Sequence, residues 1–196
     1  MSAPRLGGLV ATVLVLLLAG QVLAHITPPV VLVSDREALV GLLQGARRFF
    51  VREVRLDPAR REAIAKRTGW RPDEDFYRFY LGRDDEGGLV AAAVFLTEFT
   101  IHGPVRVAVA LGPRGQVRGA TVMELTEETY AWVKPLLDRD FTKQFVGRDS
   151  RDAFGTAAPG PSMTAFYEQV VAGLVQRAAV LFQEAVADPL AGGRRP

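Results

Sequence analysis

Cysteine is absent from the sequence and histidine is scarce, with only His25 and His102. The lack of cysteine excludes disulfides, thiolate catalysis, iron–sulfur ligation, attached c-type haem and a lipoprotein-type anchor. Two histidines argue against a His-rich metal site. His102 has no evident partner that would complete a Ser–His–Asp arrangement. We therefore expect neither metal ligands nor catalytic residues, and whether the chain is an enzyme stays open.

Net charge is also scarce, because 24 basic and 22 acidic residues leave a formal charge of +2. Basic pairs such as Arg47-Arg48 and Arg60-Arg61 are scattered among acidic runs such as Asp73-Glu74-Asp75. Without a basic face, we expect no nucleic-acid partner. The chain has 196 residues, of which 48% are hydrophobic, and this suffices for one domain with a buried core.

The stretch from Leu6 to Ala24 carries no charge, is rich in Leu, Val and Ala, and follows Arg5. A positive start, an apolar run and a small-residue exit fit a secretory signal peptide cleaved after Ala24. The run is also close to the roughly 20 residues that span a bilayer, so an uncleaved membrane anchor is an equal alternative. We expect the inner membrane with the body on the periplasmic side, or secretion to the periplasm after cleavage.

Hydrophobic periodicity and turn residues divide the rest of the chain into short elements. Helices are expected over residues 36–43, 58–67, 129–138 (interrupted by Pro135) and 165–186, and strands over 49–56, 76–81, 89–97, 105–111 and 117–125. Residues 26–33 form a linker or an edge strand, and residues 141–146 a turn or short helix. Strands cluster in the middle and helices flank them, which predicts an α+β fold: an antiparallel sheet with flanking helices, preceded by one N-terminal transmembrane helix or signal peptide.

The expected domain organisation is simple. Residues 1–25 are the signal peptide or anchor, and residues 26–187 form a single exported domain. Within it, 26–75 are a helical lead-in and 76–187 the core, while 188–196 are a disordered tail.

The last predicted helix follows the segment Pro159-Gly160-Pro161-Ser162-Met163-Thr164. Ser162 or Thr164 can cap this helix. Phe166, Val170, Leu174, Ala178 and Phe182 recur at a spacing of four and predict one core-facing side. The start of a helix favours an anion such as phosphate, although a capped loop that binds nothing is the alternative.

Four segments follow one another in the second half of the chain. They are the hairpin from Gly103-Pro104-Val105 to Val117-Arg118-Gly119, then Glu128-Thr129-Tyr130, then Phe141, Gln144, Phe145 and Gly147, and last the loop Pro159 to Ser162. In this order they resemble the FMN-binding domain family, known from the G subunit of the Rnf electron-transport complex, the C subunit of the sodium-pumping NADH:quinone reductase and the periplasmic part of the nitrous oxide reductase regulator. Family members often begin with one membrane-spanning helix.

The resemblance implies an FMN site. In the family, FMN is joined through its phosphate to the threonine of an Asp-x-x-Ser-Gly-Ala-Thr loop. Here Gly160 is kept, Ser162 replaces the threonine, and Pro159 and Pro161 supply no N–H groups. Noncovalent FMN is therefore expected ahead of covalent attachment to Ser162 or Thr164. The implied cofactor-binding residues are Glu128, Thr129, Tyr130, Gln144, Gly160, Ser162, Met163 and Thr164.

The implied function is electron transfer in or beside a membrane redox complex, whose subunits would be the partners, with the lipid bilayer contacted through the N-terminal helix. Two alternatives stay open. A degenerate member without flavin would be a structural or docking subunit of a membrane complex, and a periplasmic sensor would bind another small ligand in the same pocket. For Tyr130 and Trp132, packing in the core is the alternative to stacking on a flavin ring.

Overall fold

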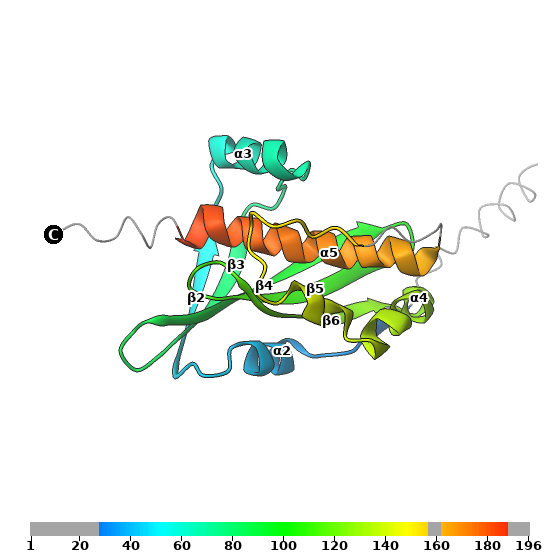
Figure 1. Ribbon diagram of the computed structural model, residues 1–196, viewed down its shortest axis with the longest axis horizontal. Coiled ribbons are helices and arrows are strands. Elements are labelled where there is room, and N and C mark those ends of the chain that lie inside the picture. Colours follow the sequence, from blue (N-terminus) through cyan, green and yellow to red (C-terminus); the bar gives the residue numbers. More distant parts are fainter. Residues whose placement is uncertain (1–27, 157–161, 188–196) are drawn as a thin grey trace, which may run out of the picture.

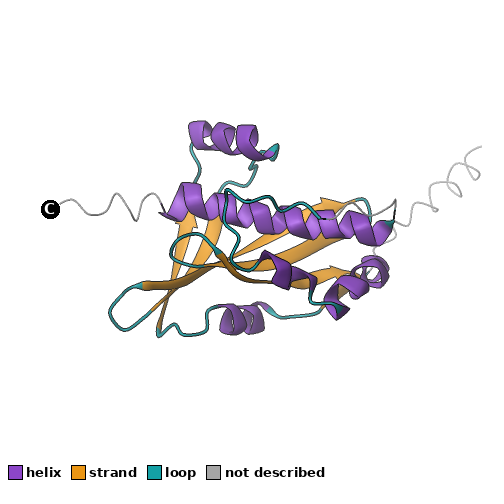
Figure 2. Cartoon of the chain, in the orientation of Figure 1, coloured by secondary structure: helices purple, strands orange, loops and turns teal. Residues whose placement is uncertain are grey.

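The computed structural model describes residues 28–156 and 162–187. The predicted N-terminal signal or anchor, Gly160 and the predicted disordered tail lie outside these residues. The described chain has an α+β fold, in which helices flank one six-stranded antiparallel sheet (Figures 1 and 2). The predicted sheet and its flanking helices are thus confirmed.

The sheet has the strand order β1-β6-β5-β4-β3-β2. Its strands are β1 (Pro29–Val31), β2 (Arg48–Val54), β3 (Tyr77–Arg83), β4 (Leu89–Thr100), β5 (Gly103–Leu111) and β6 (Val117–Thr126). Strands β2 to β6 form a meander, and β1 adds to its far edge by pairing with β6. The stretch 26–75 therefore supplies both edge strands of the sheet besides two helices.

The helices are α2 (Asp35–Leu42), α3 (Pro58–Thr68), α4 (Glu127–Asp138), the 3₁₀-helix η1 (Phe141–Phe145), α5 (Met163–Phe182) and the π-helical turn η2 (Gln183–Ala187). Two of them begin at predicted caps, and one of the two also ends at its predicted signal. Ser34 caps α2 in a capping box with Glu37, and Asp57 caps α3, which ends at the left-handed Gly69. Such signals act within a few residues, which is why the sequence reveals them.

Helix α4 differs from the prediction in two ways. It begins at Glu127 because Thr126 is its N-cap, and it runs through Pro135 without interruption. Proline removes one hydrogen bond from a helix. Val133 and Leu136 on either side of Pro135 are buried in the core, and this packing holds the last turn in place.

Helix α5 covers one face of the sheet and α2 the other (Figure 1). Leu174, Ala178 and Phe182 face the core as predicted, but Phe166 is 42% exposed, so its predicted inward position is wrong. Tyr167 takes the core position instead. The reason is that α5 is apolar on several sides, so a spacing of four fits more than one rotation of the helix.

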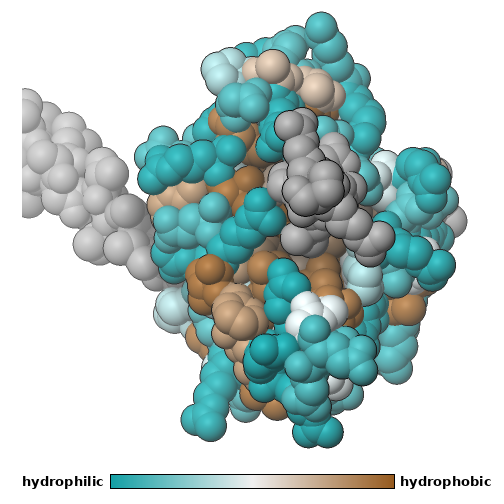
Figure 3. Space-filling view, turned by 90° about the vertical axis from the view of Figure 1, so that its left-hand side faces the viewer, coloured by the Kyte–Doolittle hydropathy of each residue, from teal (hydrophilic) through white to brown (hydrophobic). Residues whose placement is uncertain are grey.

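Strand β2 leaves one edge of the sheet unpaired, and Phe49, Phe50 and Val51 on it are exposed. The end of the molecule opposite to α4 shows hydrophobic patches among hydrophilic side chains (Figure 3). Within the described residues, the buried core lies between the sheet and α5, with smaller clusters under α2.

Candidate functional site

The first predicted site segment lies at the start of α4. Thr129 is completely buried, and its Oγ1 accepts a hydrogen bond of 3.0 Å from the Thr126 amide. The Thr129 amide in turn donates to the Thr126 hydroxyl, which closes a capping box. Tyr130 is half-buried and packs against the core. Thr129 therefore shapes the junction between β6 and α4 and presents no group to a ligand.

Glu128 is exposed and lies 2.9 Å from Nδ1 of His102, on the turn between β4 and β5. The His102 ring packs edge-on against Trp132 at 4.8 Å, and Trp132 stacks on Tyr167 of α5 at 6.0 Å. Burial raises the pKa of Tyr167, whose hydroxyl lies 3.3 Å from that of Thr100. The structure thus gives His102 a partner that the sequence did not indicate, because the two residues are 26 positions apart.

The second predicted segment forms the start of α5. Ser162 is the N-cap, and its Oγ accepts a hydrogen bond of 3.1 Å from the Ala165 amide. Met163 is half-buried against the core, and Thr164 is half-buried as well. A helix start of this kind offers unpaired N–H groups and the positive end of the helix dipole.

The third predicted residue, Gln144, lines an open cleft of about 700 Å³. The cleft lies where the end of α4 and η1 meet α5 and the loop that leads to it, and its other lining residues are Arg139, Asp140, Phe141, Lys143, Thr156 and Glu168. Its volume falls within the range of about 300–1,000 Å³ that small-molecule sites have. Neither Glu128 nor Ser162 lines this cleft, so Gln144 is the one predicted site residue found there among those that the structure describes.

Two cations of this cleft are paired with carboxylates. Arg139 forms a hydrogen-bonded ion pair with Glu168 of α5, and Lys143 Nζ lies 2.6 Å from Asp140. Gln144 Nε2 donates to the carbonyl of Phe141 at 3.0 Å. The Arg139–Glu168 pair could not be predicted from the sequence, because it joins residues 29 positions apart. The phosphate group of a ligand could replace these carboxylates as the hydrogen-bonding partner of Arg139 and Lys143.

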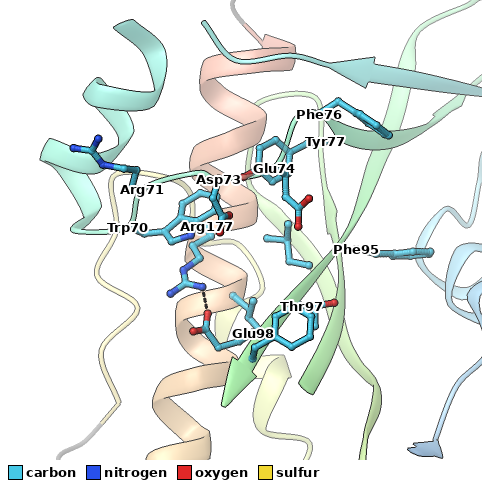
Figure 4. Close-up of a pocket in the computed structure, with 13 residues that line it drawn as sticks. Trp70, Arg71, Asp73, Glu74, Phe76, Tyr77, Phe95, Thr97, Glu98 and Arg177 are labelled. Carbon is cyan, nitrogen blue, oxygen red and sulfur yellow. Dashed lines mark hydrogen bonds and ion pairs between the residues drawn. The ribbon is translucent and has the colours of Figure 1, made fainter. Parts of the chain in front are cut away.

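A second cleft, of about 400 Å³, lies between the segment that follows α3, the strand β4 and helix α5 (Figure 4). The Arg177 guanidinium lies 5.2 Å above the Trp70 ring and is hydrogen-bonded to Glu98. Trp70 packs edge-on against Tyr77, whose hydroxyl is buried and has no hydrogen-bond partner among the described residues. None of the predicted site residues lines this cleft.

No group of three or more His, Asp or Glu side chains suited to a metal ion occurs in residues 28–156 and 162–187. Within the same ranges, Met163–Ala187 is long and apolar enough to cross a membrane by length and composition alone. This is weak evidence, because 61% of its most apolar window is buried and a core helix passes the same test. A scan against models of known protein families finds no match, and a search of curated proteins finds no relative.

Proposed function

We propose that the chain is an exported, membrane-associated FMN-binding-type domain that takes part in electron transfer in or beside a membrane redox complex. The flavin would carry the electrons, while the protein would bind it, orient it and adjust its potential. FMN would be held noncovalently, and the body would stand on the periplasmic side of the inner membrane. Redox subunits of that complex would be its partners.

The observation that supports this proposal is the cleft at Gln144. Arg139 and Lys143 line it and suit a phosphate, and Phe141 offers an apolar ring. Thr156, which precedes in the sequence the loop that resembles the flavin-carrying loop of the family, lines it as well. The residues that would hold FMN are therefore Arg139, Lys143 and Gln144.

A second function is favoured by the surroundings of Thr129 and Ser162. Thr129 is buried within a capping box, Ser162 caps α5, and Arg139 and Lys143 already have carboxylate partners. A domain with these interactions is complete without a flavin. We therefore keep, as the alternative, a structural or docking subunit of a membrane complex that binds no FMN.

The visible absorbance of the purified protein separates these functions. The protein is expressed in an exporting host that carries the flavin-attaching enzyme, and absorbance is read before and after acid precipitation. We expect colour that moves to the supernatant, since the flavin is noncovalent. A colourless protein that also takes up no added FMN would contradict the flavin proposal and support the docking subunit.

Two sets of variants locate the flavin. Lys143→Ala and Gln144→Ala should each weaken FMN binding about tenfold or more, because one charged hydrogen bond contributes about 1.5–3 kcal/mol. Lys134→Ala is the matched control, because Lys134 is paired with Asp138 and does not line the cleft. If colour stays with the pellet instead, Ser162→Ala combined with Thr164→Ala should abolish it, and its survival would exclude both hydroxyls as the attachment site.

A further inference from the structure

Three large apolar side chains are exposed at one end of the molecule. Ile101 in the turn between β4 and β5 is 93% exposed, Phe99 at the end of β4 is 79% exposed, and Phe166 in the first turn of α5 is 42% exposed. All three line one shallow groove between the turn and α5. We call Phe99, Ile101 and Phe166 the apolar tip. Exposed apolar residues that gather in this way mark a contact surface.

The backbone under the apolar tip is firmly held. The Thr100 hydroxyl donates to the Gly103 carbonyl at 2.8 Å and accepts from the His102 amide at 3.2 Å. The His102 carbonyl accepts a hydrogen bond of 2.8 Å from Thr126. Gly103 has a φ of 102°, and a Cβ there would lie 2.4 Å from a Thr126 methyl group. The exposure of Ile101 is therefore a property of a fixed turn.

The same end of the molecule holds the place where the chain arrives from its N-terminal segment. Thr126, which binds the His102 carbonyl, is paired with Pro29 of β1, and the Glu127 amide donates to the Pro28 carbonyl at 3.0 Å. Helix α4 and the start of α5 lie together at this end (Figure 1). The apolar tip and Pro28 thus lie at the same end of the sheet, with the ends of β5 and β6 between them.

The uncharged run from Leu6 to Ala24 ends shortly before Pro28. Four steps of about 3.8 Å each join Ala24 to Pro28, so the two Cα atoms are at most about 15 Å apart. If the run spans a bilayer, as one reading of the sequence predicts, the lipid surface lies within that distance of Pro28. The apolar tip is then carried to the lipid surface by the same short connection.

The surroundings of the apolar tip favour an uncharged lipid surface. Trp132 is half-buried and packs edge-on against the His102 ring of the turn, and such rings are enriched where proteins meet the headgroup region of a bilayer. Glu98 and Arg177, which line the same groove, are paired with each other, and Glu127 and Glu128 of α4 are exposed, so these charges give anionic lipids no advantage.

We propose that the apolar tip inserts into the headgroup region of the bilayer and so fixes the orientation of the domain on the membrane. An amphipathic surface of this kind reaches about 5–10 Å into the boundary between headgroups and acyl chains. The N-terminal run supplies the attachment, and Phe99, Ile101 and Phe166 supply a second contact that stops the domain from turning freely. This contact does not depend on flavin.

The lack of cysteine allows a direct test, because one introduced cysteine is the only site for a thiol-reactive nitroxide. The full-length chain with Ile101→Cys is labelled and reconstituted in phosphatidylcholine nanodiscs. Accessibility to oxygen, which concentrates in lipid, is compared with accessibility to a water-soluble nickel chelate. The control is Arg114→Cys, an exposed position in the turn at the other end of β5, about 30 Å along the strand at 3.4 Å per residue.

We expect the ratio of oxygen to nickel accessibility to be at least about threefold higher at position 101 than at position 114. Equal ratios would overturn the proposal and leave the apolar tip as a surface for a protein partner. An intact mass showing that residues 1–24 have been removed in the cell would overturn it as well, because nothing would then hold this end at the lipid.

A second label checks the contribution of the side chains. With Phe166→Cys labelled, the additional changes Phe99→Ser and Ile101→Ser should lower the oxygen-to-nickel ratio toward that at position 114. Both changes lie at exposed side chains, and an unchanged melting temperature verifies the fold. A colourless protein with a lipid-embedded label would contradict the flavin proposal alone, so the two proposals fail separately.

Discussion

The Tyr77 hydroxyl is the one buried side-chain polar atom in the described part of the chain that has no hydrogen-bond partner. The ring is 4% exposed and packs against Trp70 at 6.1 Å. Tyr77→Phe keeps this packing and removes a group whose burial is uncompensated. At pH 7 we expect the free energy of unfolding to stay equal or to rise by up to about 1 kcal/mol, as measured by urea denaturation.

The same residue makes stability depend on alkaline pH. Burial raises the pKa of Tyr77 from 10.0 to about 12, so its hydroxyl ionises first in the unfolded chain. Below pH 10 the hydroxyl is protonated in both the folded and the unfolded chain, so it adds no pH dependence to the free energy of unfolding. As the pH rises from 10 to 12, it ionises in the unfolded chain alone, and the free energy of unfolding falls. The advantage of Tyr77→Phe over the wild type should therefore grow between pH 9 and pH 11, and Tyr80→Phe on the same strand is the control. A variant that is less stable by more than about 1 kcal/mol at pH 7 would show that the hydroxyl is hydrogen-bonded.

Between β6 and α4, the capping box of Thr126 and Thr129 holds two elements in register. Thr129→Val keeps the size of the side chain but removes the oxygen that accepts from the Thr126 amide and contacts its hydroxyl at 2.9 Å. Both Thr126 groups are buried, so we expect a loss of about 1–3 kcal/mol in the free energy of unfolding. Thermal unfolding followed by circular dichroism measures it.

Thr129→Ser is the matched comparison, because it keeps the hydroxyl and loses only a methyl group. Its cost should be the smaller of the two. The reverse order would mean that packing of the methyl group, and not the capping box, holds this junction. Since Thr129 lies in a segment that resembles a motif of the FMN-binding domain family, the comparison also tells whether its role in this chain is structural.

An element can be predicted from the sequence when the interactions that determine it join residues close together in the chain. The cap residues Ser34 and Asp57 act on amides three residues away, so the sequence shows them directly. Which side of α5 is buried depends on its contact with the sheet. The sequence predicted Phe166 on the buried side, whereas the structure has Tyr167 there. The edge position of β1 depends on pairing with β6, nearly a hundred residues later, and the sequence left it open.

The same limit applies to the candidate site, where local motifs could be predicted and contacts between distant segments could not. Gln144 was identified through a local motif and lines the cleft, whereas Arg139 and Glu168 were missed because their ion pair joins α4 and α5. Thr129 matched a motif, yet its hydroxyl is used within the fold. A motif gives the type of residue at a position, and only packing decides whether that residue points to a cleft or into the core.

Across the whole molecule, burial falls from the central strand toward α3. In β5, every residue from Val107 to Leu111 is fully buried, and the strand is paired on both sides. In α3 only Ile64 is buried, and the helix stands apart from the sheet on the far side of α5 (Figure 1). We therefore expect amide hydrogens of β5 to exchange only through global unfolding and those of α3 through a local opening of lower free energy.

In addition to the ion pair of Arg67 with Glu184, Arg61 holds α3 to the neighbouring segments of the chain. Its guanidinium donates to the carbonyls of Leu56, Pro72 and Glu74 at 3.2, 2.8 and 2.7 Å, and so ties α3 to the segments on both sides. Arg61→Met keeps most of the apolar stem and removes all three bonds, so α3 amides should exchange about tenfold faster or more, with β5 amides unchanged. Arg60→Met is the matched control, since Arg60 forms only an exposed ion pair with Asp57. Hydrogen exchange followed by mass spectrometry resolves the two elements. Equal acceleration of α3 and β5 would mean that α3 and the sheet unfold as one unit, and that Arg61 stabilises the whole domain instead of holding a separately opening helix.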